Sequence, residues 1–251
     1  TDKHAQRSYG DVVKFTEEMC LQTAPARRCT MPELAAQRWE VIPGRLFWTM
    51  HRDEAQTIDC IKASPNTFYF SSWMQDAYQP FCSDFGPVNL AAVVRFCDCL
   101  DEKLQDPRLA SRDLVYYCDA DREVATNTAF LLGAYLVLVA KWTPEAAAQT
   151  FDKIEPSPLS MFRDATHVAS TFDLCLVDCF RGLQRAVDAG WLDYEQFDVA
   201  QYELLDDPDT ADAHVICPKF VAFRGPCDSA EAEPWQLPPQ HFLALFKAMD
   251  V

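Results

Sequence analysis

Short apolar runs alternate with longer amphipathic segments along most of this chain. Runs rich in aromatic and β-branched residues, bounded by turn-forming residues, predict strands at 45–50, 67–71 and 114–118. Apolar residues at helical spacing predict one helix that opens at Gly86-Pro87, and a second, apolar nearly all round, at 125–141. Strands that alternate with helices are typical of an α/β domain, here with a central mixed or parallel sheet flanked by helices.

The second half of the chain is predicted to be mainly helical. Thr143 precedes Pro144 and Glu145, a combination that favours the N-cap and first turn of a helix. The remaining predicted elements are helices at 173–189 and 239–249 and short strands at 215–216 and 220–223. No internal repeat is apparent in the sequence.

The regular α/β pattern begins near Trp39. Residues 1–38 are therefore predicted to form a short helical N-terminal extension, and residues 39–251 a single domain. Two short helices are expected in the extension, at 11–20 and 32–38.

Composition and charge narrow the range of partners. The chain has 251 residues, of which 49% are hydrophobic, enough for the core of one large domain or two small ones. The formal net charge is −16 and no stretch of Lys and Arg forms a basic stripe, which disfavours nucleic-acid binding. An acidic surface also repels anionic membranes and favours basic protein partners. The alternative is a solvated surface that only keeps the protein soluble.

Cysteine usage and hydropathy bear on location. The eleven cysteines are an odd number in an otherwise ordinary composition, and no basic region followed by a hydrophobic segment marks a secretory signal. Reduced thiols and a cytoplasmic location are therefore expected. The longest apolar run, 130–140, is interrupted by Gly133 and is too short to cross a bilayer, so no membrane association is expected.

One strand ends in a cysteine, and the order of strand, cysteine, loop and helix is that of a cysteine-phosphatase active site. In such a site the loop amides and an arginine six residues after the cysteine hold a phosphate. After Cys118 the sixth residue is Val124, and the loop carries three carboxylates, Asp119, Asp121 and Glu123. The sequence therefore predicts a structural thiol at Cys118 rather than a nucleophile.

A second cysteine matches a phosphatase spacing by count alone. Cys179 and Arg185 fit the pattern Cys-x-x-Gly-x-x-Arg. Apolar residues run through this segment at helical spacing with no break before Cys179, so the cysteine is predicted to lie within a helix, where no exposed amides can bind an anion. We predict a packed thiol here too. Cys175 with Arg181 is a weaker match of the same kind.

The sequence offers little for a metal or a cofactor. The closest cysteine pairs are Cys97 with Cys99 and Cys175 with Cys179, no Cys-x-x-Cys pair occurs, and the five histidines are scattered. A zinc site is therefore not expected. No glycine-rich nucleotide loop, Ser-His-Asp pattern or dinucleotide-binding fingerprint is apparent, so no cofactor is expected either.

Several segments together resemble a known family. The stretch 84–91, with the sequence DFGPVNLA, resembles the hallmark of the N-terminal domain of Cdc14-type dual-specificity phosphatases. Other segments similar to that domain follow the family order, at 42–48, 129–135, 143–147, 162–165, 197–203 and 217–223. The resemblance covers about residues 39–251 and implies a fold like that of a dual-specificity phosphatase.

The resemblance also implies that catalysis and substrate binding involve two different domains. Enzymes of this family pair two phosphatase-like domains, of which the first is catalytically silent and helps to form the substrate groove. The second carries the His-Cys-x5-Arg loop. On this basis the chain is expected to hold the first domain only, with the catalytic domain absent after Val251 or supplied by a separate chain.

The resemblance implies a candidate binding site in an acidic stretch of the sequence. Four aspartates occur at 206–212, and in the family acidic residues of this region select a basic residue downstream of a phosphorylated serine and proline. Asp206 and Asp209 fall on those positions, which implies that they attract Lys or Arg of a peptide. The alternative is a solvated acidic loop.

Two function hypotheses follow. The first is a non-catalytic binding or scaffold module of a larger cytosolic assembly, with the cytoskeletal or cell-cycle partners usual in the family. The second is the substrate-recognition half of a Cdc14-type phosphatase acting on phosphoserine/threonine-proline or phosphotyrosine sites. The first is favoured because the sequence lacks the catalytic loop. Phosphatase activity that depends on Cys179 is a third, weaker hypothesis.

Overall fold

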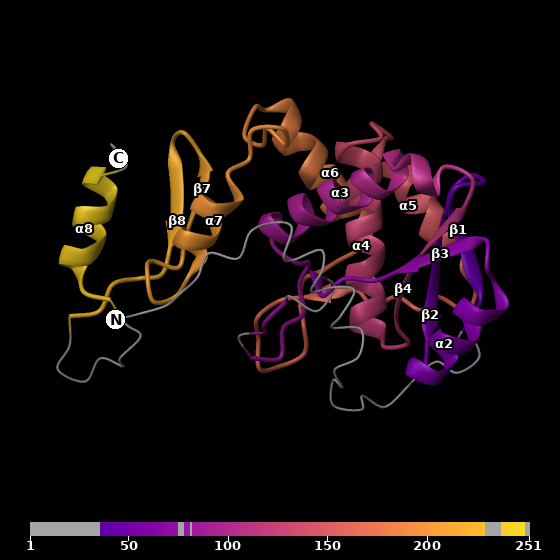
Figure 1. Ribbon diagram of the computed structural model, residues 1–251. Helices are drawn as coiled ribbons and strands as arrows, with labels where there is room; N and C mark the ends of the chain where they lie inside the picture. The colour runs from indigo at the N-terminus through magenta and orange to yellow at the C-terminus, as the bar shows by residue number, and fades with distance from the viewer. Residues whose placement is uncertain (1–35, 75–77, 81, 229–236, 249–251) are drawn as a thin grey trace, which may run out of the picture.

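The core of the protein is a four-stranded mixed sheet. The computed structural model describes residues 36–74, 78–80, 82–228 and 237–248. The strands are β1 (Arg38–Ile42), β2 (Leu46–His51), β3 (Thr67–Phe70) and β4 (Asp113–Asp119), in the order β1-β2-β4-β3. β4 runs parallel to both of its neighbours, whereas β1 pairs with β2 in the antiparallel sense. The predicted α/β class is confirmed (Figure 1).

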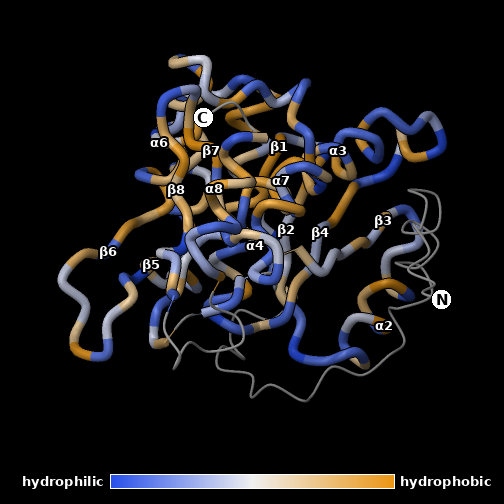
Figure 2. The backbone as a smooth tube through the Cα atoms, turned by 90° about the vertical axis from the view of Figure 1, so that its left-hand side faces the viewer, coloured by the Kyte–Doolittle hydropathy of each residue, from blue (hydrophilic) through white to orange (hydrophobic). Residues whose placement is uncertain are grey.

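Helices cover the sheet and bury its centre. α3 (Leu90–Gln105), α4 (Arg122–Leu138), α5 (Pro144–Asp152) and α6 (Leu176–Asp188) gather on one side of it (Figure 1). α4 is buried on every side from Val124 to Leu138, as its uniformly apolar sequence predicts. The shorter α2 (Glu54–Ala63) contacts the opposite face through Thr57, which bonds His51 of β2. Figure 2 shows apolar positions concentrated toward the middle of the molecule and polar positions along the outer loops.

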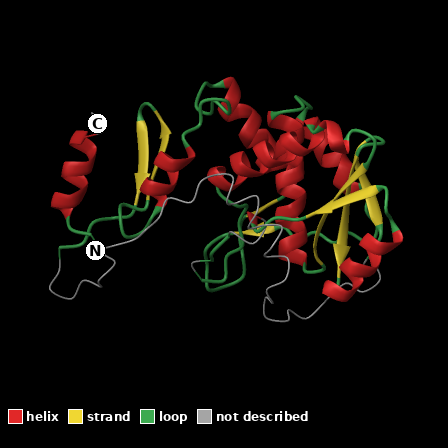
Figure 3. Ribbon diagram, viewed as in Figure 1, coloured by secondary structure: helices red, strands yellow, loops and turns green. Residues whose placement is uncertain are grey.

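The C-terminal elements lie to the left of the sheet in Figures 1 and 3. They are α7 (Val199–Asp206), the hairpin of β7 (Ala213–Cys217) and β8 (Phe220–Phe223), and α8 (Pro239–Ala248). Aromatic side chains join the hairpin to α8, because the ring of Phe223 lies 5.0 Å from that of Phe242 and 4.8 Å from that of Phe246. Shorter elements elsewhere are the 3-10 turn η2 (Pro107–Leu109) and the strand pair β5 (Phe162–Arg163) and β6 (Asp173–Leu174).

The loop before α3 is fixed by one buried side chain. Asn127 of α4 accepts from the backbone N–H of Val88 at 3.2 Å and donates to the carbonyl of Gly86 at 3.3 Å. A Cβ on Gly86 would lie 2.7 Å from the ring of Tyr78, so this position excludes a side chain. The DFGPVNLA segment therefore positions Asn89, the N-cap of α3.

Most predicted elements are present, with shifted ends that side-chain caps explain. Thr143 does cap α5, since its hydroxyl accepts from the N–H of Ala146 at 3.2 Å. The helix expected to open at Gly86-Pro87 instead begins at Leu90, after the Asn89 cap, and α4 begins at Arg122 because Asp121 caps it. The helix predicted at 173–189 begins only at Leu176, because residues 173–174 pair with β5.

Other elements were not foreseen. β1, α2 and α7 have no counterpart among the predicted elements. The helix expected at 11–20 lies outside the described residues, as does most of the one expected at 32–38, and Arg38 itself already belongs to β1. In the ranges that the structure describes, no helix is both long and apolar enough to cross a membrane.

Candidate functional site

The first candidate region is the end of β4, where the sequence has the layout of a phosphatase loop. Cys118 is only 1% exposed and lies opposite Met50 in the sheet. The indole N–H of Trp48, itself fully buried, donates to its sulfur at 3.4 Å. The thiol is therefore part of the packed core, as the sequence predicts.

The N-terminus of α4 is already capped by the protein itself. Oδ1 of Asp121 accepts from the backbone N–H groups of Glu123 and Val124, at 3.0 and 3.2 Å. Amides at a helix N-terminus are the groups that hold a phosphate in a phosphatase loop. Here a carboxylate bonds two of them and adds negative charge, while Arg122 donates to the carbonyl of Leu159 at 3.4 Å. This geometry disfavours a bound phosphate.

Cys179 lies in the first turn of α6, one turn after the N-cap Cys175. The prediction that Cys179 lies within a helix is confirmed, but this helix begins at Leu176 and not at residue 173, because β6 and the cap come before it. Burial, with a contribution from the charge of Asp178, raises the pKa of the Cys179 thiol to about 12. Arg185 is in the last turn of the helix, roughly 9 Å farther along its axis at the usual rise per residue. Thiol and guanidinium therefore do not converge on one anion.

Cys175, the weaker match, is held by a carboxylate. Oδ2 of Asp178 accepts from the backbone N–H of Cys175 at 3.1 Å and lies 3.0 Å from its sulfur. The side-chain hydrogen bond to Asp178 raises the pKa of this thiol above its ordinary value. Arg181 bonds Glu145 of α5 at 2.9 Å and lies 3.9 Å from Oδ1 of Asp178, so its guanidinium already faces two carboxylates. Neither cysteine of α6 thus has the cation that a reactive thiolate requires.

The acidic stretch forms the second candidate region, at the end of α7. Asp206 is the last residue of the helix, and its side chain is 31% exposed. Its Oδ2 accepts from the side-chain amide of Asn89 at 3.0 Å, and its Oδ1 lies 3.3 Å from Nε2 of His214. Asp206 therefore links α3, α7 and β7, and both of its oxygens already have partners within the chain.

Asp209 differs from Asp206 in its surroundings. It is exposed in the turn after α7, and its backbone N–H donates to Oδ1 of Asp207 at 2.8 Å. Asp207 is exposed as well, whereas Asp212 pairs with Arg224 at 2.5 Å. Within the described ranges, no Lys or Arg pairs with Asp207 or Asp209. The accessible carboxylates of this region are therefore Asp207 and Asp209, and sequence reasoning did not single out Asp207.

An ion pair fixes the orientation of α7. Arg95 of α3 donates to both oxygens of Glu203, from Nε at 3.1 Å and from Nη2 at 2.6 Å. Such a bidentate pair holds its two elements in one geometry. Together with the hydrogen bond from Asn89 to Asp206, this ion pair holds the acidic turn after α7 in a fixed position.

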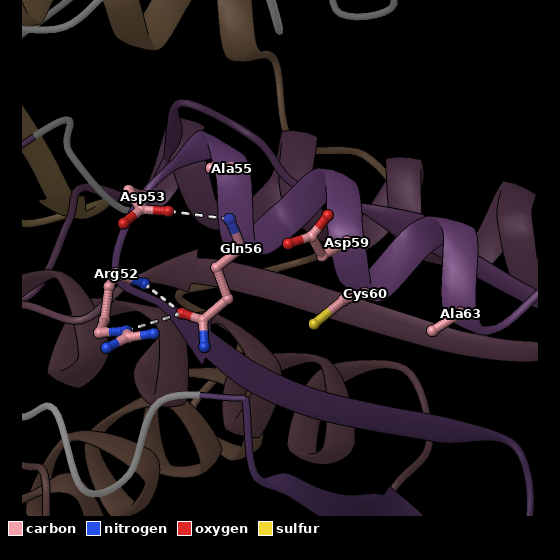
Figure 4. A pocket seen from close by; sticks show the side chains of 7 residues that line it. All are labelled: Arg52, Asp53, Ala55, Gln56, Asp59, Cys60 and Ala63. Carbon is pink, nitrogen blue, oxygen red and sulfur yellow. Dashed lines mark hydrogen bonds between the residues drawn. The ribbon is translucent and has the colours of Figure 1, made fainter.

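A depression of about 530 Å³ lies along α2, and the described residues that line it come from 52–63 (Figure 4). Asp53 caps the helix by accepting from the N–H of Gln56 at 2.8 Å, and Gln56 in turn accepts from the backbone N–H of Arg52 at 2.8 Å. These side chains thus hydrogen-bond backbone N–H groups at the start of α2. The depression contains none of the residues that the sequence singled out, and nothing in it resembles a nucleophile with its base.

The described part of the chain also lacks a metal centre, since no group of three or more His, Cys, Asp or Glu side chains in it converges on one point.

Comparison with known proteins places this geometry in context. The family model "dual specificity protein phosphatase, N-terminal half" matches residues 40–186. Human dual specificity protein phosphatase CDC14A is 37% identical over 207 residues, which are 81% of this chain and 34% of that protein. Human CDC14C is 33% identical over 193 residues, or 76% of this chain and 43% of that protein.

A yeast relative is similar over a shorter region. Tyrosine-protein phosphatase CDC14 of Saccharomyces cerevisiae is 34% identical over 149 residues, covering 59% of this chain and 27% of the yeast protein. The chain thus spans about a third of the length of the curated relatives it matches.

Proposed function

This chain belongs to the Cdc14-type dual-specificity phosphatases as their N-terminal half, and from that premise we propose that it binds basic segments of protein partners without itself catalysing dephosphorylation. The observation that carries the proposal is the acidic turn after α7. There Asp207 and Asp209 are exposed and have no Lys or Arg partner among the described residues. They directly follow α7, which an ion pair to α3 holds in place. Exposed carboxylates in a fixed arrangement attract Lys and Arg side chains of an incoming segment.

The electrostatics of the whole chain support the same partner class. A net charge of −16 steers basic segments toward the protein and repels acidic ones. Charge alone gives little specificity, however, because exposed pairs contribute only about 0.2 to 1 kcal/mol each. The fixed position of the acidic turn is what would favour one binding register over another.

Three features support the absence of catalysis in this half. Cys118 is buried beneath Trp48, Asp121 bonds the amides that a phosphate would need, and the pKa of Cys179 is raised rather than lowered. A phosphatase thiol must instead be exposed and ionised near neutral pH.

Of the two hypotheses from the sequence, these considerations favour the substrate-recognition half of a phosphatase over a free-standing scaffold. The relatives that match most of the chain are named as phosphatases, and catalytic residues supplied elsewhere would complete the activity. The scaffold role, the cytoplasmic location and the cytoskeletal or cell-cycle partners stay predictions from the resemblance.

Two assays test the proposal. In the first, residues 1–251 are incubated with an aryl phosphate; we expect no turnover, and activity that disappears in Cys179→Ser would contradict the non-catalytic part. In the second, a peptide with four Lys or Arg residues and an equally long neutral peptide are titrated with the protein. We expect binding of the basic peptide only, weakened by added salt. Equal binding of both peptides would contradict the recognition part.

A further inference from the structure

Three hydroxyl residues of the chain are followed directly by a proline, and the structure distinguishes one of them. They are Ser64, Thr143 and Ser157. Thr143 caps α5 by accepting from the N–H of Ala146, and Ser157 accepts from the backbone N–H two residues later at 3.3 Å. Ser64 instead accepts a hydrogen bond from a guanidinium. A serine before a proline is what proline-directed protein kinases phosphorylate, so the surroundings of Ser64 bear on whether it is such a site.

The guanidinium belongs to Arg38 of β1, which reaches across the sheet. Its Nη2 donates to Oγ of Ser64 at 3.2 Å and to the hydroxyl of Tyr69 in β3. The guanidinium also lies over the ring of Tyr69, 5.2 Å from the ring centroid, and this contact holds it beside the serine. β1 and β3 are the two outer strands of the sheet. No Asp or Glu of the described residues pairs with Arg38, so its charge is available to a phosphate.

The backbone around Ser64 can open to an enzyme at little cost. Ser64 is the C-cap of α2 and has a non-helical φ of −131°, because Pro65 disfavours helical backbone in the residue before it. None of the residues of α2 is buried, so its last turn depends mainly on its own backbone hydrogen bonds. Pro65 and Asn66 are exposed. Residues 61–66 can therefore enter the cleft of a kinase in extended form once that last turn unwinds.

Cationic side chains offset the position of Ser64 at a helix end. A negative charge at the C-terminus of a helix is opposed by the macrodipole and by the free carbonyl groups there. Arg38, however, is already within hydrogen-bond distance, and Lys62 lies in the same last turn of α2. A charge-assisted hydrogen bond from a guanidinium to a phosphate is roughly twice as strong as one between neutral groups. A phosphate on Ser64 thus gains more from Arg38 than it loses to the helix end.

We propose that Ser64 is a phosphorylation site for a proline-directed kinase, and that the phosphoserine binds Arg38 and ties β1 to the turn between α2 and β3. In the transfer, Oγ of Ser64 attacks the γ-phosphorus of ATP, the bond from that phosphorus to the β,γ-bridging oxygen breaks, and ADP leaves. The hydroxyl proton passes to the catalytic aspartate of the kinase. In Figure 1 α2 lies at the right and α7 toward the left, so this site is distinct from the acidic turn after α7.

Phosphorylation of residues 1–251 in solution tests the modification itself. The protein is incubated with MgATP and a mitogen-activated protein kinase, and the labelled residues are followed over time by mass spectrometry. We expect Ser64 to be labelled at least about tenfold faster than Thr143, because Thr143 caps a helix that buried residues hold in place. No phosphate on Ser64, or slower labelling there than at Thr143, would overturn the proposal.

A titration of the phosphorylated protein followed by ³¹P NMR tests the contact with Arg38. The second ionisation of a phosphoserine has a pKa of about 6, and a neighbouring guanidinium lowers it by favouring the dianion. We expect the midpoint of the titration to be at least about 0.5 pH unit higher in Arg38→Gln than in the unchanged protein.

Arg52→Gln is the matched control for this titration, because it makes the same change in net charge at the other end of α2. The ten residues of the helix place Arg52 about 15 Å from Ser64 along the helix axis. Its midpoint should therefore equal that of the unchanged protein. Equal midpoints in Arg38→Gln and Arg52→Gln would show that the phosphate does not bind Arg38 and would overturn the proposal. Neither measurement involves a basic peptide, so this proposal and the proposed function can fail separately.

Discussion

The side-chain amide of Asn89 donates a hydrogen bond to Oδ2 of Asp206 at 3.0 Å, while its carbonyl oxygen caps α3 by accepting from Ala92 N–H at 3.0 Å. One residue thus starts α3 and secures the end of α7, two elements far apart in the sequence. The position of the acidic turn depends on this bond and on the Arg95–Glu203 pair.

Asn89→Asp separates these two roles. Aspartate caps a helix about as well as asparagine, but it cannot donate to Asp206 and places a second carboxylate beside it. We expect the free energy of unfolding, measured by urea titration, to fall by about 1 to 2 kcal/mol. The double variant Asn89→Asp/Asp206→Asn restores a donor and an acceptor and should recover most of that loss. A single variant as stable as the unchanged protein would show that the bond contributes nothing.

Gly133→Ala should be strongly destabilising, although alanine is ordinarily the better helix former. A Cβ at this position of α4 would lie 2.0 Å from the ring of Phe180. That ring is fully buried and stacks on Phe130, with centroids 6.2 Å apart, so it has little room to move. We expect the free energy of unfolding to fall by about 2 kcal/mol or more.

Gly182→Ala is the matched control in the neighbouring helix. No atom lies within 4 Å of the Cβ that this substitution adds to α6. The variant should therefore gain about 0.5 to 1 kcal/mol, the usual advantage of alanine over glycine in a helix. Opposite signs for the two variants test the α4–α6 contact, and equal effects would contradict it.

His51 should make the fold sensitive to mild acid. The Thr57 hydroxyl donates to the carbonyl of Asp53 at 3.2 Å, so Nδ1–H of His51 donates to that hydroxyl, and the buried Nε2 has no partner in the described structure. Burial first, and the charge of Arg38 second, lower the pKa of His51 from 6.5 to about 4. The folded state therefore keeps a neutral imidazole where the unfolded chain takes up a proton.

Stability attributable to His51 is thus complete above pH 6.5 and declines as the pH falls toward 4, by about 3 kcal/mol at most. Carboxylates also titrate in the lower part of this window, so the measurement is a comparison. Urea unfolding between pH 7 and pH 4 should show a shallower loss in His51→Phe than in the unchanged protein. Parallel curves for the two proteins would show that His51 does not titrate as argued.

Local signals in the sequence predicted much of the fold. Thr143 with Pro144 marked the start of α5, and the apolar run before Cys118 marked β4. α2 was not predicted, because none of its residues is buried and its sequence therefore has no strong apolar face.

The candidate site was predicted only in part, for a similar reason. Packed thiols at Cys118 and Cys179 could be predicted, since apolar neighbours in the sequence predict burial. It treated Asp206 and Asp209 alike, although Asp206 is bonded to Asn89 and Asp209 is not. Residue 89 lies more than a hundred positions away, so no local pattern could indicate that contact.

Binding of a labelled basic peptide, followed by fluorescence anisotropy, tests the central claim most directly. Asp207→Asn/Asp209→Asn removes the two accessible carboxylates after α7, and Asp59→Asn/Asp152→Asn makes the same change in net charge at two other exposed aspartates. We predict that the first double variant weakens binding about three- to tenfold, whereas the second changes it less than about twofold. Equal weakening by both variants would contradict a specific acidic site and leave only a general effect of net charge.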